Sequence, residues 1–182
     1  MTTVSIIGTS GRAGNISKEL YTKMISASIT YLKSLALESI VLVSGGAAFS
    51  DHIAVHIFLH KDEYQLNIID LQLDLPCKFD MDTCKFEDNG NSDWKDNPGK
   101  VANYYHDKFN IVTNNNSYND LYKVINMDTK IHLHKGFHSR NQHVAKSDYM
   151  LAFTFGKNHP EDGGTKHTWN LCKGKKFHIS LA

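Results

Sequence analysis

Val41-Leu42-Val43-Ser44-Gly45-Gly46-Ala47-Ala48-Phe49-Ser50-Asp51-His52-Ile53-Ala54 is the stretch of sequence that decides the fold. Its short β-branched run stops at Ser44-Gly45-Gly46, and apolar residues at helical spacing begin a few residues later. Glycine lacks a Cβ, so Gly45 and Gly46 permit a sharp turn and a close approach of a ligand to the backbone. The helix that follows directs its free N–H groups and the positive end of its dipole at that turn. This arrangement is typical of a phosphate-binding site.

The same order of strand, glycine loop and helix recurs along the chain. Short apolar runs predict strands at residues 3–7, 40–43, 66–71, 131–134, 149–155 and 176–180. Segments with apolar residues at helical spacing lie between them. Strands that alternate with helices in this way pair in parallel. The sequence therefore predicts an α/β fold with a Rossmann-like, doubly wound and mostly parallel sheet, in a single domain over residues 1–182.

Residues 75–130 interrupt this rhythm and are rich in Asp, Asn and Lys. We expect an irregular excursion followed by two helices, at 100–109 and 117–126, the second with Ser117 and Asp120 as a capping box. A long insertion in a compact domain is often a lid or a binding element. The alternative is a decoration peculiar to this family.

Four of the loops leave the same edge of the predicted sheet. In an open parallel sheet, ligands bind beyond the carboxyl ends of the strands. Glycines there offer backbone N–H groups, and arginine matches phosphate or carboxylate with a planar pair of donors. An anionic ligand, most simply a nucleotide, fits this inventory. The predicted binding residues are Gly8, Ser10, Gly11, Arg12, Ser44, Gly45, Gly46, Arg140, Asn141, Gly163, Gly164, Thr165 and Thr168.

The titratable residues of these loops are candidates for catalysis. General acid–base chemistry needs a carboxylate or imidazole within reach of the leaving group, and the candidates are Asp51, Glu161, Asp162 and His167. Asp51 also has a structural alternative, because a carboxylate at a helix start can cap free N–H groups. His132, His134 and His138 cluster in the sequence, but without nearby cysteines they predict solvated imidazoles and no metal site. No cofactor is implied.

Bulk composition is that of a soluble globular protein. Formal net charge is +1 and charged residues make up 21%, so no strong field demands nucleic acid as a partner. Three cysteines without a CxxC pair favour a reducing compartment. No signal peptide and no apolar run long enough to cross a bilayer are evident. We therefore expect a cytoplasmic protein that has no membrane partner.

Two motifs resemble a known superfamily. Ser44-Gly45-Gly46-Ala47, followed by Asp51 and Ala54, resembles the SGGA-x-G-[IV]-D-x-x-A signature of the DprA/Smf proteins. The run from Ser147 to Phe153, followed by Gly163-Gly164-Thr165, resembles the end of the wider SLOG superfamily, which also holds the LOG-type nucleotide phosphoribohydrolases. The resemblance implies a Rossmann-like domain that binds nucleotide or nucleic acid and commonly forms a homodimer.

The chain departs from both signatures. The phosphoribohydrolases carry PGGxGTxxE, whose glutamate takes part in cleaving the base–ribose bond, whereas His167 or Thr168 stands in that neighbourhood here. Phe49 or Ser50 replaces the second glycine of the DprA signature. Three functions stay open: a nucleotide-binding domain, an N-glycosidic hydrolase or transferase acting on a nucleotide, and single-stranded DNA binding on stacked aromatic residues. The aromatic candidates are Trp94, Tyr104, Tyr105 and Trp169.

Overall fold

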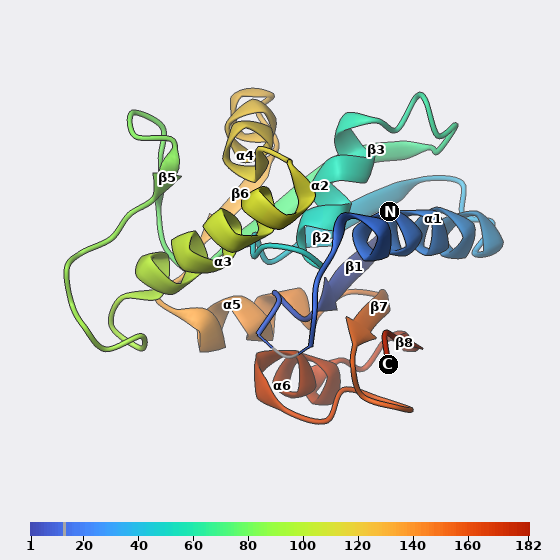
Figure 1. The fold of residues 1–182 in the computed structure, drawn as a ribbon. Helices are drawn as coiled ribbons and strands as arrows, with labels where there is room; N and C mark the ends of the chain where they lie inside the picture. The colour runs from blue at the N-terminus through green and yellow to red at the C-terminus, as the bar shows by residue number, and fades with distance from the viewer. Residues whose placement is uncertain (13) are drawn as a thin grey trace.

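A six-stranded parallel sheet forms the centre of the molecule (Figure 1). The computed structural model describes residues 1–12 and 14–182. The strand order across the sheet is β6-β3-β2-β1-β7-β8, and every neighbouring pair in it is parallel. The strands are β1 (Thr2–Gly8), β2 (Ile40–Ser44), β3 (Ile68–Leu75), β6 (Lys130–Leu133), β7 (Tyr149–Thr154) and β8 (Lys175–Ser180).

Helices cover both faces of this sheet, which confirms the predicted doubly wound, Rossmann-like α/β fold (Figure 1). One face carries four helices that contact one another, and the other carries α5 and α6. From β1 the chain adds β2, β3 and β6 on one side and then β7 and β8 on the other, so the switch point lies between the neighbours β1 and β7. The helices are α1 (Lys18–Ser34), α2 (His52–Leu59), α3 (Pro98–Thr113), α4 (Ser117–Asn126), α5 (Phe137–Val144) and α6 (Gly163–Leu171).

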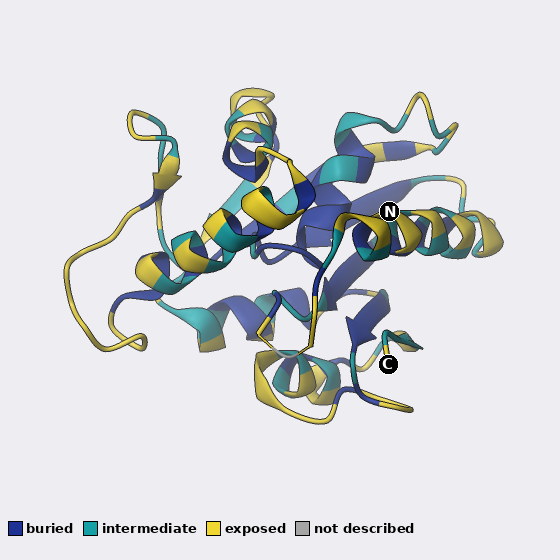
Figure 2. Cartoon of the chain, viewed as in Figure 1, coloured by how far each residue is buried: buried dark blue, intermediate teal, exposed yellow. Residues whose placement is uncertain are grey.

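Alternating side chains of the central strands divide the core into two layers. Along β1, Val4 and Ile6 belong to the layer under α1 to α4, and Ile7 belongs to the layer under α5 and α6. The same alternation holds in β7, where Leu151 and Met150 face opposite ways. Successive residues of a strand point to opposite faces, so both faces of these strands are apolar and buried (Figure 2).

Strand β3 differs most from the expectation. The sequence predicts a strand over residues 66–71, but the strand runs over Ile68–Leu75. The observed strand continues through the polar residues Gln72 and Asp74. Both side chains have polar partners in the fold, among them each other, because Gln72 Nε2 donates to Asp74 Oδ2 at 2.9 Å.

The insertion after β3 holds a small antiparallel hairpin and two helices. The hairpin pairs β4 (Phe79–Asp80) with β5 (Lys85–Phe86). Helix α3 begins two residues earlier than predicted, because Pro98 is a favourable first helical residue, and it ends four residues later, before the left-handed Asn114. Helix α4 covers the predicted residues, but the capping box is wrong. Asn116 caps it instead, since its side chain accepts from the N–H of Asn119 at 3.1 Å.

The insertion is part of the main core. Phe86, Phe109 and Leu121 belong to the same buried apolar cluster as the sheet residues under α1 and α2. Within the part of the chain that the structure describes, no helix is long and apolar enough to cross a membrane.

Candidate functional site

A cavity of about 880 Å³ opens at the carboxyl ends of the strands. Seventeen residues were named from the sequence as binding or catalytic candidates. Of these, only Gly11 and Ser44 do not line the cavity. The fifteen that line it are Gly8, Ser10, Arg12, Gly45, Gly46, Asp51, Arg140, Asn141, Glu161, Asp162, Gly163, Gly164, Thr165, His167 and Thr168.

Hydrogen bonds of Ser44 stabilise the glycine turn that follows β2. Its buried hydroxyl donates to the carbonyl of Asp51 at 2.8 Å and accepts from the N–H of Gly46 at 3.1 Å. Gly46 has φ +75°, a left-handed conformation that favours glycine. A Cβ on Gly45 would lie 2.7 Å from both Arg140 Nη1 and Asp51 Oδ2. Ser44 therefore shapes the turn from a buried position outside the cavity lining.

Gly11 also lies beneath the surface of the site. It is buried, and its carbonyl accepts a hydrogen bond from Lys108 Nζ on α3 at 2.8 Å. The insertion thus holds the loop that follows β1.

Asp51 does not cap α2. It occupies the cap position, but its side chain makes no capping bond to the helix. Its Oδ2 accepts from the N–H of Ala47 at 3.4 Å and lies 3.8 Å from Arg140 Nη1. Burial raises the pKa of this carboxyl, and Arg140 opposes that shift. A carboxyl group with a raised pKa at the edge of a cavity is a chemically plausible proton donor.

Arg140 is buried and committed to partners in the protein. Its Nη1 donates to the carbonyl of Gly45, and its Nε donates to Asn141 Oδ1 at 2.7 Å. Burial lowers the pKa of the guanidinium, and Asp51 opposes the shift. Arg140 therefore links α5 to the glycine turn, a structural role that its position in the sequence did not reveal.

Arg12 is the exposed arginine of the site. Its Nη2 lies 3.7 Å from Asp162 Oδ1, and the two side chains are 62% and 79% exposed. Asp162 stands before the first residue of α6, yet it makes no side-chain bond to the helix. The first N–H groups of a helix have no partner within the helix, so those of α6 are donors that Asp162 leaves uncapped beside Arg12.

Two hydroxyls and a carboxylate of this region have different roles. Thr168 Oγ1 donates to the carbonyl of Gly164 at 2.8 Å, within α6. Glu161 accepts from the N–H of Lys157 at 3.3 Å. Thr165 lines the cavity from the first turn of α6.

An aromatic wall faces these loops. Trp94, Tyr105 and Phe137 line the cavity, with the rings of Trp94 and Phe137 6.1 Å apart. Sequence reasoning missed Phe137, although its place beside Gly136 at a strand end was a usable signal. Tyr104 is 64% exposed and lies outside the lining. Trp169 also lies outside it and packs against the core layer under α5 and α6.

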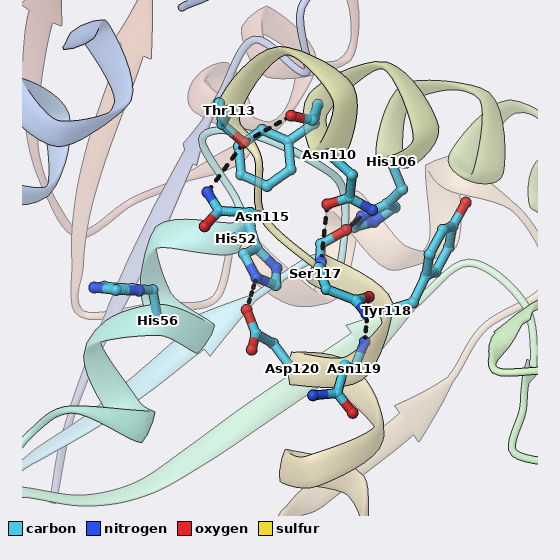
Figure 3. A network of polar contacts seen from close by, with 12 residues as sticks. His52, His56, His106, Asn110, Thr113, Asn115, Ser117, Tyr118, Asn119 and Asp120 are labelled. Atoms are coloured by element: carbon cyan, nitrogen blue, oxygen red, sulfur yellow. Dashed lines mark hydrogen bonds and ion pairs between the residues drawn. The ribbon is translucent and has the colours of Figure 1, made fainter. Parts of the chain in front are cut away.

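A buried histidine of the insertion, which Figure 3 shows beside Ser117, connects α3 to the glycine turn. His106 of α3 donates from Nε2 to the carbonyl of Gly46 at 2.9 Å, and its Nδ1 accepts from Ser117 Oγ at 2.7 Å. Burial lowers the pKa of His106 to about 3, with His52 adding to the effect. His52 of α2 in turn pairs with Asp120 of α4 at 2.9 Å (Figure 3). The glycine turn is thus contacted by α3, and α3 is in turn linked to α4 through Ser117.

Comparison with known proteins gives one informative relative. The chain is 34% identical over 189 residues to the uncharacterized protein R261 of Acanthamoeba polyphaga mimivirus, covering 98% of this chain and 96% of the relative. The chain belongs to the family of this mimivirus protein. No protein-family model matches this member of the family, and no solved structure matches it.

The histidines of this mimivirus-family protein are arranged differently from the prediction. The sequence grouped His132, His134 and His138, but His138 lies in the cavity with its ring 4.8 Å from that of His167. His134 instead lies beside Asp74 and His143, outside the cavity lining. Asp74 and His143 were not considered from sequence, because they come from β3 and α5.

Proposed function

We propose that this protein binds a nucleotide, or a nucleotide-derived anion, in the cavity at the carboxyl edge of the sheet. The observation that carries the proposal is that one cavity is lined both by hydrogen-bond donors for an anion and by aromatic rings. One wall has the uncapped start of α6 beside Arg12, and the other has the aromatic rings of Trp94 and Phe137.

The first wall suits phosphate. Free N–H groups at a helix start and the positive end of its dipole attract anions. Arg12 adds an exposed guanidinium that can form paired hydrogen bonds to a phosphate. The hydroxyls of Ser10 and Thr165 are further donors in the lining.

The second wall suits a planar base. Aromatic side chains offer a flat apolar surface for stacking. The volume of about 880 Å³ is within the range of small-molecule sites, so a nucleotide fits without opening the fold.

Calorimetric titration with a panel of nucleoside mono-, di- and triphosphates tests this proposal. Gly164→Asp places a carboxylate at the start of α6, and we expect about a 10-fold weaker affinity than in the neutral match Gly164→Asn. Arg12→Ala should weaken binding similarly, whereas Lys23→Ala, which removes an exposed charge of α1, should not. The absence of binding to every nucleotide, or equal affinity in the Asp and Asn variants, rejects the proposal.

The position of Asp51 favours a second candidate, hydrolysis or transfer at the N-glycosidic bond of a nucleotide. Burial raises the pKa of its carboxyl, so it suits protonation of a departing base. Incubation with nucleoside monophosphates should then release free base, and Asp51→Asn should abolish that release. Binding without release supports the first candidate alone. A homo-oligomeric state and a cytoplasmic location stay predictions.

A further inference from the structure

Three side chains outside the cavity bring metal-binding atoms together. Asp74, His134 and His143 each offer one ligand atom, and these three atoms all lie within 4.8 Å of one another. They come from β3, from the residue after β6 and from α5. From this convergence we propose that Asp74, His134 and His143 form a zinc site.

The ligand set matches the chemistry of Zn²⁺. Two imidazole nitrogens and one carboxylate oxygen are frequent zinc ligands, and three protein ligands leave a fourth position for water. Asp74 Oδ1 lies 3.0 Å from His134 Nε2 and 2.6 Å from His143 Nδ1. Tetrahedral ligands at about 2.0–2.1 Å from zinc lie about 3.3 Å apart, so the ion needs only a small outward shift of these atoms.

The outer atoms of the ligands are already held in place. His134 Nδ1 is 3.1 Å from Ser139 Oγ, and Asp74 Oδ2 accepts from Gln72 Nε2 at 2.9 Å. Such outer hydrogen bonds orient the ligands in metal sites. The same Gln72 nitrogen lies 3.4 Å from His143 Nδ1.

Two further features agree with a bound cation. Asp74 is fully buried, and a buried carboxylate is paired with hydrogen-bond donors or a cation, or it coordinates a metal. The nearby guanidinium of Arg140 bonds instead to Gly45 and Asn141. His132 Nε2 is buried without a hydrogen-bond partner, and its ring is 4.7 Å from that of His143. The side chain of His143 is 28% exposed, which leaves a path for the ion.

A zinc ion here would fasten α5 to β3 and β6. Helix α5 also carries Arg140, which holds the glycine turn of the cavity. The site is independent of the proposed nucleotide, because none of its three ligands lines the cavity.

Titration of the tag-free, EDTA-treated full chain with ZnCl₂ tests the proposal by calorimetry. We expect one Zn²⁺ per chain and a higher melting temperature with the ion. Asp74→Asn and His143→Gln should each lower the affinity at least about 100-fold. His60→Gln is the matched control, since His60 stacks on His56 4.4 Å away in α2, another imidazole pair, and it should leave the affinity unchanged.

X-ray absorption at the zinc edge identifies the ligand atoms in the wild-type complex. This measurement needs no variant, so it tests the site even if a variant fails to fold. We expect nitrogen and oxygen ligands with histidine scattering and no sulfur. Failure to bind one zinc, a sulfur ligand, or loss of binding in His60→Gln but not in His143→Gln would overturn the site.

Discussion

Phe49 shows how one residue can combine backbone strain with core packing. Its φ is +64°, and its side chain is fully buried. The DprA-like signature has a glycine at this point of the sequence, and it is Phe49, not Ser50, that adopts a left-handed conformation here. The ring packs 5.9 Å from that of Tyr21 and 6.2 Å from that of Phe109. Aromatic packing therefore offsets a conformation that favours glycine.

At position 49, a glycine variant should be more stable than an alanine variant, the reverse of the usual order of stability. Both Phe49→Ala and Phe49→Gly lose the ring, at about 3–5 kcal/mol of unfolding free energy. Because φ is positive, the glycine variant should be about 1 kcal/mol more stable than the alanine variant. Phe153, fully buried in β7, is the control, where alanine should be the more stable. Urea unfolding measures both pairs, and an alanine variant at position 49 as stable as glycine contradicts the prediction.

Helix α3 is the element that stabilises the site from the insertion. Its His106 bonds the carbonyl of Gly46 and its Lys108 bonds the carbonyl of Gly11. The same helix packs Phe109 into the main core. Both glycine loops therefore depend on an element that begins more than fifty residues after the second loop.

The buried imidazole of His106 should make stability fall in mild acid. Its folded pKa is about 3, below the unfolded value of about 6.5, so the unfolded state binds the extra proton between these values. The contribution is complete above about pH 6.5 and declines toward pH 3, at up to about 1.4 kcal/mol per pH unit. His106→Gln keeps a donor for Gly46 but cannot titrate. We expect its unfolding free energy to change less steeply between pH 6.5 and 4.5, and an unchanged slope would refute the assignment.

At the scale of the whole molecule, one apolar cluster spans the sheet and the insertion. It joins Leu42 and Leu71 of the sheet to Phe109 and Leu121 of the inserted helices. Elements that share a core unfold together in small domains. The insertion is therefore part of the cooperative unit.

The two tryptophans offer a direct test of this cooperativity. Trp94 lies in the insertion and Trp169 lies in α6, so Trp169→Phe and Trp94→Phe each leave one local fluorescent reporter. We expect each variant's fluorescence midpoint in urea to coincide with its own midpoint by circular dichroism. A Trp94 transition at lower urea would show that the insertion unfolds first.

The sequence by itself determined the fold class and brought fifteen of the residues that line the cavity to one edge of the sheet. Alternating apolar runs and glycine loops are set by neighbouring residues, through backbone conformation and burial. Parallel strands then bring their ends to one edge, which is why fifteen named residues share a lining. The end of β3 was misplaced, since Gln72 and Asp74 have partners that a local pattern does not reveal.

Only the tertiary structure decided what each side chain contacts. Arg140 donates to the carbonyl of Gly45, which is 95 residues away in the chain. It therefore supports the glycine turn, whereas the sequence predicted that it binds the ligand. His143 joins Asp74 and His134 because α5 crosses the face of the sheet above them. Such partners follow from strand order, register and helix placement, and no local spacing in the sequence carries that information.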